Sequence, residues 1–149
     1  MLPEVNLCRE TNMIFVTVGT TYKFDSLVEA VDSLKLKEKV VIQIGRGKYA
    51  PKNCKYFRFK KSLLSCIQQA RLVIAHGGAG TTFEVLKTGK RLISIANPEV
   101  NDNHQQDLLE RLHKEKYILW CQKLSEIREA INSKRRLKKY RSPSCEIGK

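Results

Sequence analysis

A histidine, three glycines and two threonines stand close together in the peptide HGGAGTT, at positions 76–82. The apolar run LVIA precedes the peptide and a helical pattern follows it. Glycine permits a sharp strand-to-helix turn and lets a ligand approach the backbone, and the N–H groups at a helix N-terminus attract phosphate. The threonine hydroxyls add hydrogen-bond donors. We therefore expect a diphosphate to bind here, with a plain tight turn as the alternative. The expected binding residues are Gly77, Gly78, Gly80, Thr81 and Thr82.

Two well-known glycine-rich nucleotide sites do not fit this peptide. It lacks the GxxxxGK[ST] pattern of P-loop triphosphatases and the GxGxxG pattern of dinucleotide-binding domains. The latter also require an acidic residue about 20 positions further on, after the second strand. Here the next apolar run, RLISIA, ends at Asn97 and Pro98. The sequence therefore argues against a nucleotide triphosphatase and against a nicotinamide dinucleotide site.

Glu84 lies four residues after Gly80, about one helical turn from the expected phosphate-binding end. A carboxylate there can accept two hydrogen bonds from a ribose 2′,3′-diol, and the helix dipole favours its negative charge. A glutamate near a helix N-terminus also stabilises the helix without any ligand. The spacing alone does not separate these two interpretations.

Two further polar loops are expected on the same edge of the sheet. The segment NPEVNDNHQQ (97–106) follows one strand and can present amides to sugar hydroxyls, although Asp102 or Asn103 can equally serve only as a helix N-cap. A histidine such as His104 is more often an exposed helix residue than a catalyst. Three such loops together outline a nucleotide-sugar cleft. The additional candidates are Gly19, Thr20, Thr21, Asn103, His104, Gln105 and Gln106.

Strand-like and helix-like segments alternate along the chain, and the strand cores are continuous apolar runs. Such runs are typical of strands buried on both faces, so we predict an α/β fold with a parallel sheet and helices on both faces. We expect one domain over 13–140, a loose leader over 1–12 and a loose tail over 141–149. The expected strands are 13–19, 40–45, 55–59, 72–76, 91–96 and 117–121, and the expected helices are 24–34, 62–70, 80–89, 102–115 and a long closing helix over 124–140.

The 149 residues carry a net charge of +13, much of it within KRRLKKYR at 134–141. Such a run fits nucleic acid, an anionic membrane surface or an acidic partner, but a solvated terminal helix explains it equally well. No apolar stretch reaches the roughly 18–20 residues of a membrane span, and the first residues do not read as a secretory signal. We therefore expect a cytosolic protein. The five cysteines stand singly, which argues against a disulfide framework or a zinc site.

Three segments together resemble the C-terminal, donor-binding half of GT-B glycosyltransferases. They are MIFVTVGTT, AHGGAGTTFEVLKTGKRLISIANP and DNHQQDLLERLHKEKY, and the resemblance runs in order over about residues 13–121. Within that group the sequence is most similar to the small catalytic subunits of two-part UDP-N-acetylglucosamine transferases, which add the second sugar of the dolichol-linked oligosaccharide. The resemblance implies a single Rossmann-like domain and a hexosyltransferase activity. The donor would be UDP-N-acetylglucosamine and the acceptor N-acetylglucosaminyl-pyrophosphoryl-dolichol, joined with inversion in a β-1,4 linkage.

The resemblance also assigns roles to individual residues. Gly77, Gly78, Gly80 and Thr81 would hold the UDP diphosphate, and Thr82 stands where the family often has a small residue. Glu84 would bind the ribose. Gly19, Thr20 and Thr21 would close the cleft, and Asn103, His104, Gln105 and Gln106 would face the sugar. His76 and His104 are the candidates for general base, unless that base lies in a partner.

One Rossmann-like domain is half of a GT-B enzyme. The resemblance therefore implies a membrane-anchored partner subunit that binds the lipid-linked acceptor and recruits this chain to the cytosolic face of the endoplasmic reticulum. No DxD motif is present, so we expect neither a metal nor another cofactor. The alternatives are an exopolysaccharide-type UDP-hexose transferase subunit, an inactive relative, and a non-catalytic basic module that binds nucleotide or nucleic acid. No RNA-binding signature supports the last, and we expect no nucleic-acid partner.

Overall fold

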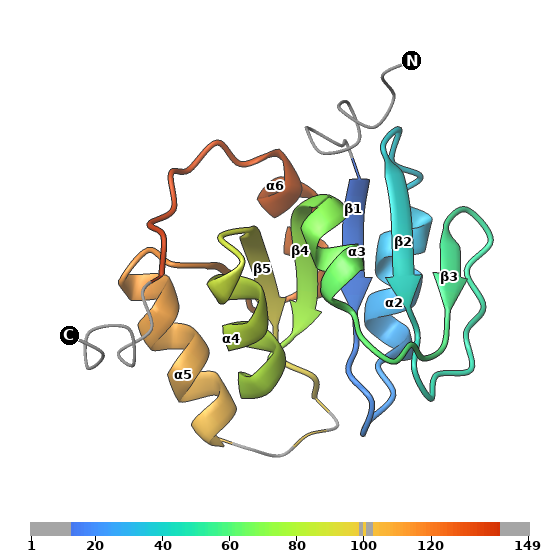
Figure 1. Ribbon diagram of the computed structural model, residues 1–149, viewed down its shortest axis with the longest axis horizontal. Helices are drawn as coiled ribbons and strands as arrows, with labels where there is room; N and C mark the ends of the chain where they lie inside the picture. Colours follow the sequence, from blue (N-terminus) through green and yellow to red (C-terminus); the bar gives the residue numbers. More distant parts are fainter. Residues whose placement is uncertain (1–12, 99, 101–102, 141–149) are drawn as a thin grey trace.

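A computed structural model describes residues 13–98, 100 and 103–140 of the chain. Its centre is a six-stranded sheet in the order β3-β2-β1-β4-β5-β6, and every neighbouring pair of strands is parallel (Figure 1). The strands are β1 (Met13–Thr17), β2 (Lys39–Gln43), β3 (Lys55–Phe57), β4 (Ala70–His76), β5 (Arg91–Ile95) and β6 (Leu119–Cys121). The helices are α2 (Asp25–Ser33), α3 (Leu64–Gln69), α4 (Ala79–Lys87), α5 (Asn103–Lys114) and α6 (Ile127–Asn132), with a 3-10 turn η1 (Leu124–Glu126).

Helices cover both faces of the sheet, because each central strand is apolar on both of its sides. In β1, Ile14 and Val16 pack on one face with α2 and α6, whereas Phe15 packs on the other face with α3, α4 and α5. All five residues of β1 are buried, and Ile14, Phe15 and Val16 are fully buried. The predicted α/β fold with a parallel sheet between two helical layers is confirmed.

The predicted closing helix over 124–140 is wrong. The chain forms only η1 and α6, and residues 133–140, which we call the basic strap, have no regular secondary structure. Like charges one helical turn apart destabilise a helix, and a helix through this run would stack several. The basic strap instead follows tertiary contacts: the N–H of Lys138 donates to the carbonyl of Lys116, and Tyr140 packs against Phe83 and Tyr117.

The predicted leader (1–12) and tail (141–149) lie outside the described residues, as does Asp102. Within the described part of the chain, no helix has both the length and the apolarity needed to cross a bilayer.

Candidate functional site

The sheet has one topological switch point, between β1 and β4. From β1 the chain runs through α2 to β2 on one side, and from β4 it runs through α4 to β5 on the other side. The loops after β1 and β4 therefore diverge, and a crevice opens outside the carboxyl ends of these strands. In open α/β sheets, ligands bind at this position.

A cavity of about 290 Å³ occupies this switch point. The loop after β1, the glycine peptide after β4 and the loop after β5 all line it, as the sequence predicted. Gln105 reaches it from α5, and no Asp or Glu is among its described lining residues. The predicted residues that line it are Gly19, Thr20, Thr21, His76, Gly78, Gly80, Thr81 and Gln105.

His76 lines this cavity, and both of its ring nitrogens are engaged in hydrogen bonds. The backbone N–H of Gly78 lies 3.2 Å from Nδ1, and the hydroxyl of Thr81 lies 3.3 Å from Nε2. Since a backbone N–H can only donate, Nδ1 carries the lone pair and the ring proton sits on Nε2, which donates to Thr81. Burial lowers the pKa of His76, which keeps the ring neutral. This geometry favours a positioning role over the predicted role in proton transfer.

Three glycines of the site make room for protein side chains. A Cβ on Gly19 would lie 2.7 Å from Nε2 of His76, and a Cβ on Gly78 would overlap Cε1 of the same ring. The imidazole is therefore enclosed between two glycines from different loops. At Gly77 a Cβ would lie 2.7 Å from the side chain of Leu109 on α5. At Gly80, by contrast, a Cβ would meet no described atom within 4 Å, so this glycine leaves open space.

Helix α4 presents an uncapped N-terminus to the cavity. Its N-cap is Gly78, and no described side chain caps it. No acidic residue stands in the first turn, so the partial positive charge of the helix end is not neutralised locally. Uncapped N–H groups and this partial charge are the features that bind phosphate.

Thr82 does not face the cavity, so the structure does not support its predicted role in binding the substrate. Its side chain is fully buried and its hydroxyl donates to the carbonyl of Gly78 at 2.7 Å. Threonine hydroxyls commonly bond the carbonyl four residues earlier in a helix. Thr81, one position earlier, points in a different direction and lines the cavity.

The remaining predicted residues lie around the cavity rather than in its lining. Glu84 is exposed on α4, three positions after Thr81 and therefore on the same side of the helix. Asn103 is the first residue of α5, and His104 is exposed beside it. Neither His104 nor Glu84 lines the 290 Å³ cavity.

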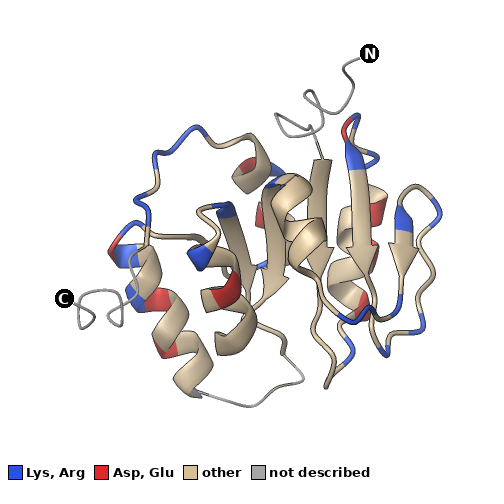
Figure 2. Cartoon of the chain, viewed as in Figure 1, with Lys and Arg blue, Asp and Glu red and all other residues tan. Residues whose placement is uncertain are grey.

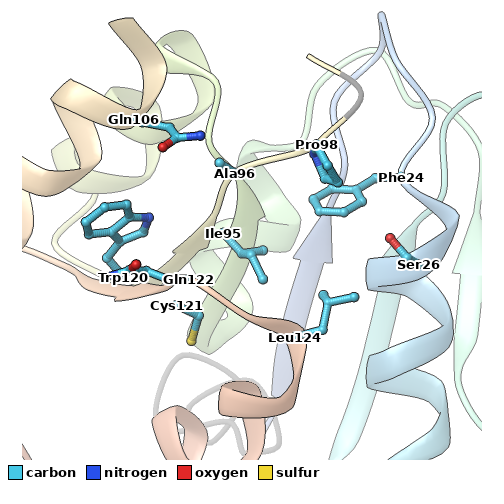
Figure 3. A pocket seen from close by; sticks show the side chains of 10 residues that line it. All are labelled: Phe24, Ser26, Ile95, Ala96, Pro98, Gln106, Trp120, Cys121, Gln122 and Leu124. Carbon is cyan, nitrogen blue, oxygen red and sulfur yellow. The ribbon is translucent and has the colours of Figure 1, made fainter. Parts of the chain in front are cut away.

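Gln106 lines a neighbouring cavity of about 260 Å³ at the ends of β5 and β6. Figure 3 shows Gln106 entering it from α5 and Trp120 from β6, with Phe24 and Pro98 on the far side. The side chain of Asn97 donates to the carbonyl of Lys23 at 2.9 Å and ties together the loops after β5 and β1. The two predicted glutamines therefore serve different cavities, because consecutive helix residues point in different directions.

A buried glutamine that sequence reasoning missed fixes the loop after β1. Gln43, on β2, accepts hydrogen bonds from the Thr17 hydroxyl at 2.6 Å and from the Val18 N–H at 3.2 Å. Its amide nitrogen donates to the carbonyls of Gly19 and Arg58, both at 3.0 Å. The signal was present in the sequence, since a glutamine inside the apolar run VVIQIG needs a buried polar partner.

Comparison with known proteins agrees with this geometry. Residues 13–142 match the model of the glycosyltransferase family 28 C-terminal domain. The chain belongs to this family. The resemblance seen in the sequence is thereby confirmed, and the switch-point cavity is the cavity of a family 28 domain.

The human UDP-N-acetylglucosamine transferase subunit ALG13 is 41% identical over 123 residues. The match covers 72% of this chain and 11% of that protein, so the chain spans about a tenth of this relative's length. Two solved structures share the fold. The solution structure of ALG13 has a TM-score of 0.60 at 23% identity, covering 82% of this chain and 84% of that one. The crystal structure of MurG from Acinetobacter baumannii has a TM-score of 0.64 at 20% identity, covering 83% of this chain and 41% of that one.

Proposed function

We propose that this family 28 domain is the donor-binding catalytic subunit of a heteromeric glycosyltransferase. It moves N-acetylglucosamine from UDP-N-acetylglucosamine to N-acetylglucosaminyl-pyrophosphoryl-dolichol, with inversion and a β-1,4 linkage. The observation that carries the proposal is the uncapped N-terminus of α4 facing a switch-point cavity. The name of the human relative, a UDP-N-acetylglucosamine transferase subunit, supports both the donor sugar and the assignment as a subunit.

The diphosphate of the donor binds at the N-terminus of α4 in this proposal. The chain of hydrogen bonds from the Gly78 N–H through His76 to Thr81 orients the threonine. Because His76 donates to the Thr81 oxygen, the hydroxyl hydrogen is directed away from the ring and can donate to a phosphate oxygen. Hydrogen bonds in such a chain polarise one another, which strengthens the last one. Gly80 leaves open space where a phosphate can approach the backbone.

Transfer breaks the bond between C1 of the sugar and the β-phosphate oxygen. An acceptor hydroxyl attacks C1 from the opposite face, its proton passes to a general base, and UDP leaves with the bonding electron pair. The α4 N–H groups, the helix dipole and the Thr81 hydroxyl stabilise the charge that develops on the leaving oxygen. The proposal assigns no step to a metal, since these groups already meet that charge.

The acceptor and the general base belong to a partner in this proposal. The domain matches 41% of the MurG chain, and the human relative is named a subunit, which supports a second polypeptide as the source of the acceptor-binding half. His76 has no lone pair free for the acceptor, and His104 lies outside the cavity. A membrane-anchored partner would hold the lipid acceptor and recruit this domain to the cytosolic face of the endoplasmic reticulum.

Titration with UDP, UDP-N-acetylglucosamine and UDP-glucose tests the donor site. Removing the Thr81 hydroxyl in Thr81→Val should weaken UDP binding about 10-fold or more, since a hydrogen bond to a charged group contributes about 1.5–3 kcal/mol. Thr88→Val is the matched control: its hydroxyl bonds the Val85 carbonyl at the other end of α4, and UDP affinity should not change. Absence of UDP binding by the wild-type chain, or equal affinity of both variants, would contradict the site.

Co-expression with an acceptor-binding membrane subunit tests the activity. We expect transfer of N-acetylglucosamine to a short-chain pyrophosphoryl-lipid acceptor by the complex and little transfer by this chain alone. Preference for UDP-glucose over UDP-N-acetylglucosamine would instead favour the exopolysaccharide-type alternative.

A further inference from the structure

The basic strap closes a second, strongly positive cavity at the opposite end of the sheet from the donor site. This cavity has a volume of about 310 Å³ and lies between the strap and the C-terminal end of α4. Seven of its twelve lining residues are Lys or Arg, and none is Asp or Glu. Arg91, the first residue of β5, lines it, whereas the donor cavity lies beyond the last residue of that strand. Figure 2 shows blue segments along the chain after α6, among others elsewhere in the domain.

Specific contacts hold the basic strap in place. At its start, the Arg91 guanidinium donates to the carbonyl of Ser133 at 3.2 Å. Further on, the Lys138 N–H donates to the carbonyl of Lys116 at 2.8 Å. At its end, the centroid of the Tyr140 ring lies 5.4 Å from the ring centroid of Phe83 and 5.4 Å from that of Tyr117. These contacts fix the path of the strap backbone, from which five exposed cations project: Lys134, Arg135, Arg136, Lys138 and Lys139.

The positive charge of this cavity is not neutralised by the described residues. Their ion pairs are Arg71–Glu38 and Lys114–Glu110, and neither involves a lining residue of the cavity. Burial, and then the neighbouring Arg71, lowers the pKa of the Arg91 guanidinium. One or two cations suffice to complement the negative end of the α4 dipole. Seven cations around one concavity exceed that need and concentrate the field there.

We propose that this cavity binds a ligand carrying two or more phosphate groups. Arginine recognises phosphate, as it does carboxylate, with two parallel hydrogen bonds, and lysine binds phosphate as a point charge. The volume lies at the lower end of the range for small-molecule sites, which suits a compact polyphosphate better than an extended nucleic-acid strand. The ligand is either a soluble polyphosphate or the headgroup of a multiply phosphorylated lipid. The site is separate from the donor cavity and does not depend on the proposed transferase activity.

Calorimetric titration of the full chain with inorganic tripolyphosphate at about 0.15 M salt tests the soluble source. Flotation with vesicles containing phosphatidylinositol bisphosphate tests the lipid source, against vesicles of equal charge made with phosphatidylserine. Saturable one-to-one binding of tripolyphosphate, or selective binding of the bisphosphate vesicles, supports the proposal and identifies the source. Equal binding of both vesicle types without tripolyphosphate binding overturns it, because charge alone would then suffice.

A triple variant locates the binding. Lys134→Gln, Arg136→Gln and Lys139→Gln together should weaken tripolyphosphate binding at least 10-fold, with circular dichroism reporting an unchanged fold. The matched control removes the same charge elsewhere, through Lys37→Gln, Lys39→Gln and Lys55→Gln, and should weaken it less than 2-fold. The titrations are run with saturating UDP, which occupies the donor site in the proposed function, so that the binding measured is that of the strap cavity. An equal loss in the control triple, or tighter and longer-footprint binding of single-stranded RNA that displaces tripolyphosphate, would overturn the proposal.

Discussion

Gly78→Ala tests whether His76 is enclosed between glycines. The backbone of Gly78 is extended, with φ −66° and ψ 138°, so alanine is compatible with the backbone and the effect comes from its Cβ alone. That Cβ would overlap Cε1 of His76. The imidazole ring cannot simply rotate away, because its Nδ1 accepts a hydrogen bond from the N–H of Gly78 and Gly19 lies on the other side of the ring.

The expected magnitude follows from two opposing effects. Overpacking of this kind costs about 1–3 kcal/mol, whereas replacing glycine by alanine gains about 0.4–1 kcal/mol by restricting the unfolded chain. We expect a net loss of about 1–2 kcal/mol in the free energy of unfolding. For a domain of this size, each kcal/mol lowers the melting temperature by about 2–4 °C.

Urea denaturation of a double-mutant cycle isolates the contact. In a His76→Ala background the steric cost disappears, so Gly78→Ala should become neutral or stabilising by up to about 1 kcal/mol. Gly80→Ala is the companion control, because its Cβ would meet no described atom. In the wild-type background this substitution should raise the free energy of unfolding by about 0.5–1 kcal/mol and lower the affinity for UDP. If Gly78→Ala cost the same with and without the histidine ring, the enclosure of His76 would be wrong.

Three further predictions follow from buried polar groups. Gln43→Leu should lower the free energy of unfolding, measured in urea, by about 2–4 kcal/mol, since it leaves the carbonyl of Gly19 and other buried partners without a hydrogen bond. An unchanged urea midpoint would show that these hydrogen bonds do not stabilise the fold. Burial opposes the charge of Asp32, but two backbone N–H groups and Tyr49 outweigh it and lower its pKa below 3.8. Its stabilisation is therefore complete above about pH 4 and is lost as the pH falls through the lower folded value, and Asp32→Asn should flatten that acid limb of melting temperature against pH. Burial raises the pKa of Cys54 to about 12, so mass spectrometry should find this thiol unalkylated after brief iodoacetamide treatment at pH 8, and rapid labelling would contradict its thiol state.

Several features of the site were readable from the sequence because they depend on local patterns. Apolar β-branched runs such as LVIA form strands buried on both faces wherever they occur in an α/β domain. Glycine-rich turns and polar loops at the ends of those runs necessarily meet at one edge, because parallel strands share their direction. The prediction that a diphosphate binds at Gly80 and Thr81 rests on this arrangement and stays a prediction. Glu84, Asn103 and His104 lie near this edge, and their predicted roles await the binding experiments.

Other features required the tertiary structure, because they depend on contacts between distant segments. The sequence placed Gly19, Gly77 and Gly78 against a ligand, but their missing Cβ atoms make room for His76 and for α5. Thr82 was grouped with Thr81, yet the helix turns it inward to bond a carbonyl. Helical rotation also sends Gln106 into a different cavity from Gln105.

The two ends of the domain show the division most clearly. At the carboxyl edge of the sheet, strand direction and turn chemistry are encoded locally, so the sequence by itself predicted the three loops that line the switch-point cavity. At the opposite end, the same kind of reasoning predicted a long basic helix. Charge repulsion along the run and the packing of Tyr140 on Phe83 and Tyr117 decided otherwise, and they folded the basic strap into the wall of a cavity.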